Sequence, residues 1–237
     1  MSERPRLLDL FCGEGGVAMG FHRAGFEVVG VDTDEARLAR YPFESHRADA
    51  LEFLIEHGHE FHHRHASPTC TGYSRGTAAI PGRIARYDRL IAATREALLE
   101  VGGSYTIENV EDARRELRSP VLLCGRMFGL SAVDSDGTPL VLDRHRLFES
   151  NVLLLAPEHL KHDRSMQVAG AYGGARRDKH EARHVRKGGY VPRDLSVLRD
   201  LLGTPWMSEK GCFLSVPPAY TEFLGAQLLA HLSEQAA

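Results

Sequence analysis

The stretch around Cys70 carries the residue type best suited to covalent chemistry. A Ser67-Pro68 turn precedes the cysteine, and Gly72 follows it. A thiol at the end of a strand lies at the rim of a sheet, where open α/β folds bind their ligands, and there it can act as a nucleophile. The alternative is a small buried apolar side chain, which is what most free cysteines are. This stretch alone favours the buried cysteine, so the decision depends on its neighbours.

Acidic and amide side chains follow two more apolar runs. Asp32 follows the run 27–31, and Glu108 and Asn109 follow the run 104–107. Because the carboxyl ends of parallel strands meet at one edge of a sheet, we expect these groups near Cys70.

The amino-terminal third has the pattern of a nucleotide-binding βαβ unit. A strand at 6–11 is followed by a glycine turn at 12–16, a helix at 17–24, and a second strand that ends in Asp32. The glycines let the backbone approach a ligand, and the acid accepts hydrogen bonds from ribose hydroxyls. The turn lacks the G-x-G-x-x-G fingerprint, which disfavours a dinucleotide such as NAD.

Asp49 follows a weak strand at 45–47, where its carboxylate could meet an adenine amino group. It could equally be an N-cap for a helix at 51–56, and one residue can serve both purposes.

The stretch 57–65 is rich in histidine but has no cysteine or downstream ligand at a recognisable spacing. We expect solvated imidazoles there, although the stretch is unusually polar for the strand that leads to Cys70. The cysteines are far apart and form no CxxC pair, which argues against structural zinc and disulfides and favours a reducing cytoplasm. The sequence therefore predicts no metal.

Length and composition favour one α/β domain with a small inserted lobe. The chain has 237 residues, 43% of them hydrophobic and 26% charged. It has no apolar run of about 18 residues and begins with a polar segment, so we expect neither membrane association nor a secretory signal. Oligomeric state is not predicted, and a monomer is assumed.

Charge is distributed unevenly along the chain. The net charge is −3, but residues 161–193 hold nine Lys or Arg against three acids, a local balance of +6. Such asymmetry fits either a phosphate-facing lobe on an acidic body or a solvated basic loop.

The remaining segments supply further predictions. A glycine-bearing basic loop at 71–86 suits a lid, and a helix at 87–101 follows it. We expect short helices at 113–117 and 121–127 and a hairpin turn at 136–137.

Arg144 and Arg146 follow another apolar run and are expected on one face of a strand. There they either belong to a surface strand or point at a polar substrate. Helices are expected at 194–202 and from Pro218 to about 231.

In order along the chain, these motifs resemble those of the C5-cytosine DNA methyltransferase family. The matching segments are Asp9-Leu10-Phe11-Cys12-Gly13-Glu14-Gly15-Gly16, Val31-Asp32, Thr69-Cys70, Glu108-Asn109-Val110, Arg144-His145-Arg146, 201–206 and 216–225.

The resemblance implies an α/β fold, the Rossmann-like class I methyltransferase fold. It has a mixed, mostly parallel sheet with helices on both faces and a small inserted target-recognition lobe. We expect a catalytic domain at 1–155, a basic recognition segment at 156–193, and carboxy-terminal helices at 194–237 that return to the catalytic domain. The resemblance also implies a cytoplasmic protein of bacterial or phage origin.

The same resemblance implies S-adenosylmethionine as cofactor, DNA, expected to be double-stranded, as partner, and a covalent mechanism. Cys70 would add to C6 of a flipped-out cytosine, Glu108 would protonate or hydrogen-bond N3, and Arg146 would orient the base. Arg144 would support the site, and Asn109 would hold the backbone around the cysteine.

The remaining predicted site residues fall into two groups. The cofactor-binding residues are Asp9, Phe11, Cys12, Gly13, Gly15, Gly16, Asp32, Thr33, Asp49, Ala50, Pro68 and Tyr220. The nucleic-acid-binding residues are Ser74, Arg75, Arg83, Arg176, Arg177, Lys179, Arg186 and Lys187.

Two departures from the family pattern leave room for a different substrate: Thr69 replaces the family's proline and Thr71 its glutamine. With the short recognition lobe, they motivate a pyrimidine methyltransferase of RNA, single-stranded DNA or a free nucleotide. A catalytically silent nucleic-acid binder and an NAD-dependent redox enzyme are two further possibilities.

Overall fold

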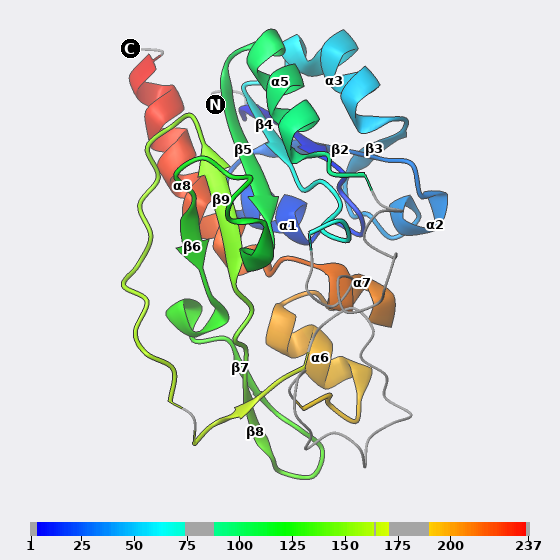
Figure 1. The fold of residues 1–237 in the computed structure, drawn as a ribbon. Coiled ribbons are helices and arrows are strands. Elements are labelled where there is room, and N and C mark those ends of the chain that lie inside the picture. The colour runs from blue at the N-terminus through cyan, green and yellow to red at the C-terminus, as the bar shows by residue number, and fades with distance from the viewer. Residues whose placement is uncertain (1–3, 74–87, 164, 171–189, 236–237) are drawn as a thin grey trace.

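A seven-stranded sheet forms the centre of the protein (Figure 1). The computed structural model describes residues 4–73, 88–163, 165–170 and 190–235. The strand order is β3-β2-β1-β4-β5-β9-β6, in which β9 runs antiparallel to both of its neighbours and the first five strands are parallel. The strands are β1 (Arg6–Leu10), β2 (Glu27–Asp32), β3 (Glu44–Arg47), β4 (His63–Ala66), β5 (Ser104–Asn109), β6 (Val121–Leu123) and β9 (Arg146–Ser150).

Helices cover both faces of this sheet because its strands are apolar on both sides. Leu7 belongs to the core under α1 and α8, whereas its neighbour Leu8 belongs to the core under α3 and α5. Val28 and Val29 of β2 divide in the same way. The helices are α1 (Gly16–Ala24), α2 (Glu35–Leu38), α3 (Ala50–His57), α5 (Ile91–Val101), α6 (Leu195–Leu202), α7 (Glu209–Leu214) and α8 (Pro218–Gln235), with 3-10 turns η1 (Gly58–Glu60), η3 (Glu111–Ala113) and η4 (Gly125–Phe128).

The histidines of β4 are not solvated as we expected. His63 and His65 are fully buried in the sheet. His63 hydrogen-bonds Ser104 and Thr106, and His65 hydrogen-bonds Thr106 and Ser67. Burial lowers the pKa of His65 to about 3 and the pKa of His63 well below its usual range, so both rings are neutral.

A smaller sheet carries a second core below the first (Figure 1). Its strand order is β10 (Gln167–Val168), β8 (Pro139–Val141), β7 (Ser131–Val133), and the β7–β8 turn lies at Gly137 as predicted. This core includes Leu140, Ala169, Tyr190 and Leu198. It therefore contains residues from each of the three predicted segments, 1–155, 156–193 and 194–237. The recognition role of the segment 156–193, which contributes β10 to this sheet, stays a prediction.

The segment 121–127 differs from the predicted helix. Val121 to Leu123 form edge strand β6, which pairs with β9, and η4 follows. A short apolar run fits either structure, and here the free edge of β9 selects a strand. In the described ranges, no helix combines the length and apolar character needed to cross a membrane.

Candidate active site

The turn after β1 is built from residues with positive φ. Phe11 (59°), Gly13 (57°) and Gly15 (84°) all adopt it, and Gly15 N–H closes the turn by donating to the Cys12 carbonyl at 3.0 Å. Glycine adopts this conformation at no steric cost, whereas Phe11 is strained, as residues at functional sites often are. The turn leads directly into α1.

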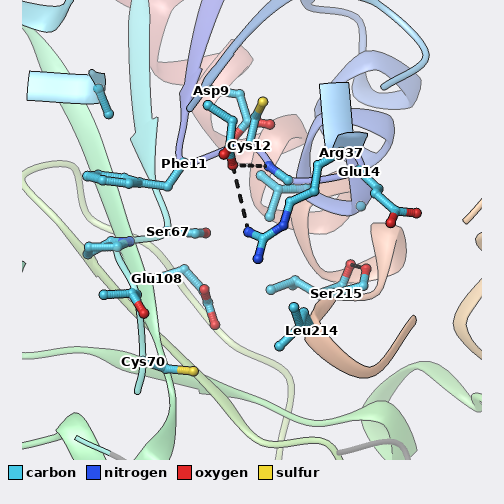
Figure 2. Close-up of a pocket in the computed structure, with 18 of the residues that line it drawn as sticks. Asp9, Phe11, Cys12, Glu14, Arg37, Ser67, Cys70, Glu108, Leu214 and Ser215 are labelled. Atoms are coloured by element: carbon cyan, nitrogen blue, oxygen red, sulfur yellow. Dashed lines mark hydrogen bonds and ion pairs between the residues drawn. The ribbon is translucent and has the colours of Figure 1, made fainter. Parts of the chain in front are cut away.

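Asp32 at the end of β2 is tied to that turn. Its carboxylate accepts hydrogen bonds from the backbone N–H groups of Gly13 and Asp34, each at 2.9 Å. The guanidinium of Arg37 lies 4.0 Å away (Figure 2). A carboxylate has about four acceptor positions, so Asp32 retains capacity for ligand hydroxyls while it holds the turn.

Asp9 lies fully buried in β1. Its Oδ2 accepts a hydrogen bond from Tyr41 at 3.2 Å, and its Oδ1 has no hydrogen-bond partner among the described residues. Burial raises the pKa of Asp9 to about 8, an effect that the Tyr41 hydrogen bond opposes and nearby Asp32 reinforces. A buried carboxyl with an unused oxygen beside a cavity suits a cationic or hydrogen-bond-donating ligand.

The Cys70 thiol lies at the tip of the loop after β4. The side chain is partly exposed, and Figure 2 shows the sulfur and the Glu108 carboxylate pointing into the same cavity. Burial raises the pKa of the thiol; Arg146 acts in the opposite direction, and Glu108 adds to the rise. The thiol is therefore not a buried apolar filler, and it needs its surroundings to lose its proton.

Glu108 and Arg146 form a buried ion pair beside the thiol. Glu108 lies in β5 and Arg146 begins β9, and Arg146 Nε lies 2.9 Å from the Glu108 carboxylate. Burial raises the pKa of Glu108, while Arg146 and a hydrogen bond from Ser67 lower it. The net effect is a carboxyl that holds its proton to a higher pH than usual.

Asn109 holds the loop of the cysteine. Its Nδ2 donates to the Pro68 carbonyl at 2.8 Å, and its Oδ1 accepts from the Val110 N–H at 3.0 Å. The Thr69 hydroxyl contacts the Thr71 hydroxyl at 3.2 Å, so the two departures from the family pattern contact each other.

A cavity of about 500 Å³ joins the turn after β1 to the thiol. Of the predicted site residues, it is lined by Asp9, Phe11, Cys12, Gly13, Gly16, Asp32, Thr33, Asp49, Ala50, Pro68, Cys70, Glu108 and Arg146. Asp49 also caps α3, since its carboxylate accepts from Leu51 and Glu52 N–H.

Like Asn109, the predicted site residues Tyr220, Gly15 and Arg144 lie away from the cavity lining. Tyr220 is fully buried in α8 and donates to the Arg144 carbonyl at 2.6 Å. Gly15 packs against Tyr41, which a β-carbon there would contact at 3.0 Å. Arg144 is fully buried and donates to the carbonyls of Cys212 and Phe213 in α7, so it is a positioning residue.

The predicted nucleic-acid-binding residues lie outside the described residues. They are Ser74, Arg75, Arg83, Arg176, Arg177, Lys179, Arg186 and Lys187, and their role stays a prediction.

The arrangement of the whole chain matches solved methyltransferases. A prophage-encoded Escherichia coli protein described as a DNA modification methyltransferase matches at TM-score 0.58 and 15% identity, over 97% of this chain and 99% of that one. Schizosaccharomyces pombe Dnmt2 matches at 0.60 and 14%, with the same coverage. Entamoeba histolytica EhMeth matches at 0.55 and 12%, over the full length of both chains. The fold is that of a Rossmann-like class I methyltransferase.

The predicted fold is thus confirmed, and the expected resemblance to DNA methyltransferases holds at the level of fold. No protein-family model and no curated protein matches the sequence.

The methyltransferase fold also brings residues to the cavity that the sequence did not single out. Glu14 accepts hydrogen bonds from the N–H and hydroxyl of Ser208, which ties the turn after β1 to the start of α7. Ser67 lies between His65 and Glu108, and Lys210 lines the rim. Glu14 lies inside the glycine turn and Ser67 directly before Pro68, so motif position is the signal that could have found them.

The acidic half of the cavity fits S-adenosylmethionine better than a dinucleotide. The carboxylates of Glu14, Asp32 and Asp49 line it, together with Asp9, which holds its proton to about pH 8. The methionine portion of that cofactor carries a sulfonium and an ammonium group, whereas a dinucleotide presents an anionic pyrophosphate. Carboxylates attract the former and repel the latter.

Proposed function

We propose that this protein is an S-adenosylmethionine-dependent methyltransferase that acts on C5 of cytosine in DNA through a covalent adduct of Cys70. The observation that carries the proposal is the cavity in which Cys70, Glu108 and Arg146 meet the glycine turn and Asp32. A nucleophile, a proton-holding acid and a cation at one end, and a nucleoside-binding turn at the other, are the parts that this reaction needs.

The residues near the turn would hold the cofactor. Asp32 would accept hydrogen bonds from the ribose hydroxyls and Asp49 one from the adenine amino group. The Phe11 ring offers a face for the adenine, and the unused Asp9 Oδ1 an acceptor for the ammonium. When bound, S-adenosylmethionine supplies the electrophilic methyl group that C5 accepts.

The residues near Cys70 would make C5 reactive. The Cys70 thiol gives up its proton to solvent and its sulfur forms a bond to C6, and the electron pair of the C5–C6 double bond moves through the ring toward N3. Glu108 provides the proton or hydrogen bond that stabilises charge at N3, and Arg146 orients the base oxygen. After C5 is methylated, a base removes the C5 proton, the C5–C6 double bond forms again, and the sulfur leaves C6 as the thiolate, while any proton given to N3 returns to Glu108.

The pKa directions suit these roles. Burial raises the pKa of Glu108, which keeps an acid protonated at N3. Burial also raises the pKa of Cys70, and the guanidinium of Arg146 offsets part of that rise. The thiol therefore stays protonated until substrate completes the site, which protects it from wasteful reaction.

Stacked duplex DNA cannot present C5 and C6 to a side chain, so the cytosine must leave the helix. The basic segment 161–193 supplies the charge for phosphate contacts. Because this segment is short, RNA, single-stranded DNA and a free nucleotide are the competing substrates that the experiment must include.

The test is methyl transfer from labelled S-adenosylmethionine to duplex DNA, unmodified tRNA and deoxycytidylate, each compared with a Cys70→Ala control. We expect 5-methylcytosine in the DNA and none from the control. If label entered only tRNA or only deoxycytidylate, that molecule, and not DNA, would be the substrate. Cofactor binding without product would favour the silent nucleic-acid binder, and absence of S-adenosylmethionine binding would favour the NAD-dependent enzyme.

A further inference from the structure

One cysteine and three histidines converge outside the active-site cavity, next to the turn that precedes β9. Cys124, His145, His159 and His162 each present one ligand atom, and these four atoms lie within 4.8 Å of one another. We propose that these residues, the cysteine–histidine cluster, bind a structural zinc ion. The proposal does not depend on the methyl transfer proposed above.

Three of the six distances between the ligand atoms are close to those of a tetrahedral zinc site. Nε2 of His159 lies 3.1 Å from Nε2 of His145 and 3.1 Å from Nε2 of His162. The Cys124 sulfur lies 3.3 Å from Nε2 of His162. Zn–N bonds of about 2.0–2.1 Å and a Zn–S bond of about 2.3 Å place tetrahedral ligand atoms about 3.3–3.6 Å apart.

Two carboxylates orient two of the three histidines, His145 and His162, with their Nε2 nitrogens inward. His145 Nδ1 lies 3.1 Å from Glu111, and His162 Nδ1 lies 2.9 Å from Asp143. Because a carboxylate accepts, the Nδ1 of a neutral imidazole must donate to it, and Nε2 then carries the lone pair. Metal-binding histidines almost always have a hydrogen-bond acceptor of this kind on the nitrogen that faces away from the metal.

That tautomer leaves a cluster of acceptors that a cation would satisfy. The Nε2 lone pairs of His145 and His162 both face Nε2 of His159, which holds at most one proton. A zinc ion satisfies all three nitrogens and binds the buried Cys124 as a thiolate. The thiolate, Glu111 and Asp143 offset the charge of the ion, and Arg126 pairs with Asp143 from the outer side.

Two ligands of the cluster lie on a segment that has several exposed leucine side chains. His159 and His162 lie in the segment 153–163 after β9, where Leu153, Leu155 and Leu160 are 84%, 65% and 68% exposed. Cys124 follows β6, and His145 lies between Arg144 and Arg146. Four protein ligands complete the coordination sphere, which is typical of structural zinc. The ion would fasten this segment to the turn that carries Arg144 and Arg146.

The sequence predicted no metal because its cysteines form no CxxC pair. Here a single cysteine joins three histidines from two other segments, and only His159-x-x-His162 is a local pair. The folded chain therefore supports a metal that the cysteine spacing alone disfavours.

Metal analysis of the untagged full-length protein, expressed with zinc and dialysed, tests the proposal. We expect one zinc per chain, and less than a tenth of that in Cys124→Ser and in the exposed-ligand variant His159→Ala. The controls Cys212→Ser and His46→Ala should retain wild-type zinc. Wild-type protein that holds no stoichiometric zinc, or ligand variants that keep it, would overturn the proposal.

Cobalt substitution of the wild-type protein provides a readout of the ligand set that needs no variant. Cobalt(II) bound to wild-type protein should give the intense visible absorption of tetrahedral coordination and a sulfur-to-cobalt charge-transfer band, and zinc should displace both. The charge-transfer band should vanish in Cys124→Ser. An octahedral spectrum, or a charge-transfer band that persists in Cys124→Ser, would contradict the assigned ligands.

Discussion

At the residue scale, the proposed chemistry depends on how burial changes the pKa values of two acidic groups that have opposite roles. Cys70 must lose a proton and Glu108 must keep one, and burial raises the pKa of both. The positive charge of Arg146 lowers the pKa of both groups. It therefore helps Cys70 to lose its proton but opposes the retention of a proton by Glu108. The Glu108–Arg146 ion pair at 2.9 Å therefore determines how readily each group holds its proton, and substrate binding must change that distribution of protons.

Replacing Glu108 tests that balance. Glu108→Gln should lower kcat about 10²–10³-fold, since the amide can hydrogen-bond N3 but cannot protonate it. In the wild type, kcat/KM should fall as pH rises through the raised pKa of Glu108, because the protonated form is the active one. The variant should lose this fall, whereas exposed-site Glu100→Gln should keep it. A fully active Glu108→Gln would exclude the acid role.

Asp9 couples cofactor binding to stability. Its pKa is raised from 3.8 to about 8, so the stability it contributes is complete below pH 4 and is lost as pH rises from about 4 to about 8. Asp9→Asn should therefore raise the free energy of unfolding at pH 7 by about 1–3 kcal/mol and flatten its dependence on pH. Urea unfolding at several pH values measures both effects.

The same variant should bind S-adenosylmethionine at least tenfold more weakly by calorimetry, because the amide, unlike the Asp9 carboxyl, cannot give up a proton to become the charged acceptor that pairs with the ammonium. An Asp9→Asn protein that is less stable and binds the cofactor with wild-type affinity would contradict both roles of Asp9.

Much of the site was predictable at this scale, because motif position identifies residues that point from strand ends. Asp32, Cys70, Glu108 and Arg146 meet in one cavity as the sequence indicated. A helix pattern does not tell which face an aromatic ring occupies; Tyr220 lies outside the cavity lining, and its role in cofactor binding stays a prediction.

At the scale of elements, β4 shows how a polar strand can occupy the middle of a sheet. His63 and His65 pair in register with Ser104 and Thr106 of β5, and their rings bond these hydroxyls. The two histidines, like Ser104 and Thr106 opposite them, are two residues apart and therefore face the same side of the sheet. That match becomes visible only when the two strands are set side by side, and the sequence of β4 alone does not identify its partner.

These buried rings should make the protein labile to acid. The folded-state pKa of His65 is lowered to about 3, so the stability it contributes is present above pH 6.5 and is lost as pH falls. In His65→Gln, the dependence of unfolding free energy on pH between about 5 and 6 should decrease by about 1.4 kcal/mol per pH unit. Exposed-site His46→Gln serves as control, and an unchanged slope in His65→Gln would contradict the assigned pKa shift.

At the scale of the whole molecule, the doubly covered sheet was predictable because βαβ periodicity and motif order agree. The second core was not, since Leu140, Tyr190 and Leu198 come together from segments far apart in the chain. Contacts of this kind leave no local pattern. The cysteine–histidine cluster was hidden for the same reason.

The charge distribution of the molecule predicts how it binds nucleic acid. Arg176→Ala combined with Arg177→Ala should weaken duplex binding and reduce the slope of log K against log salt by about 2, since two phosphate contacts are lost. Arg4→Ala with Arg23→Ala removes equal charge and should leave the slope unchanged. Equal salt slopes for the two double variants would show that segment 161–193 is not part of the interface with nucleic acid.

The most direct test of the central claim is a covalent trap. Duplex DNA containing 5-fluorocytosine, incubated with the protein and S-adenosylmethionine, should give an adduct stable to denaturation, because fluorine at C5 blocks release of the sulfur. Mass spectrometry should map the adduct to Cys70, and Cys70→Ser should give none. An adduct on another residue, or methylated cytosine made by Cys70→Ser, would contradict the claim.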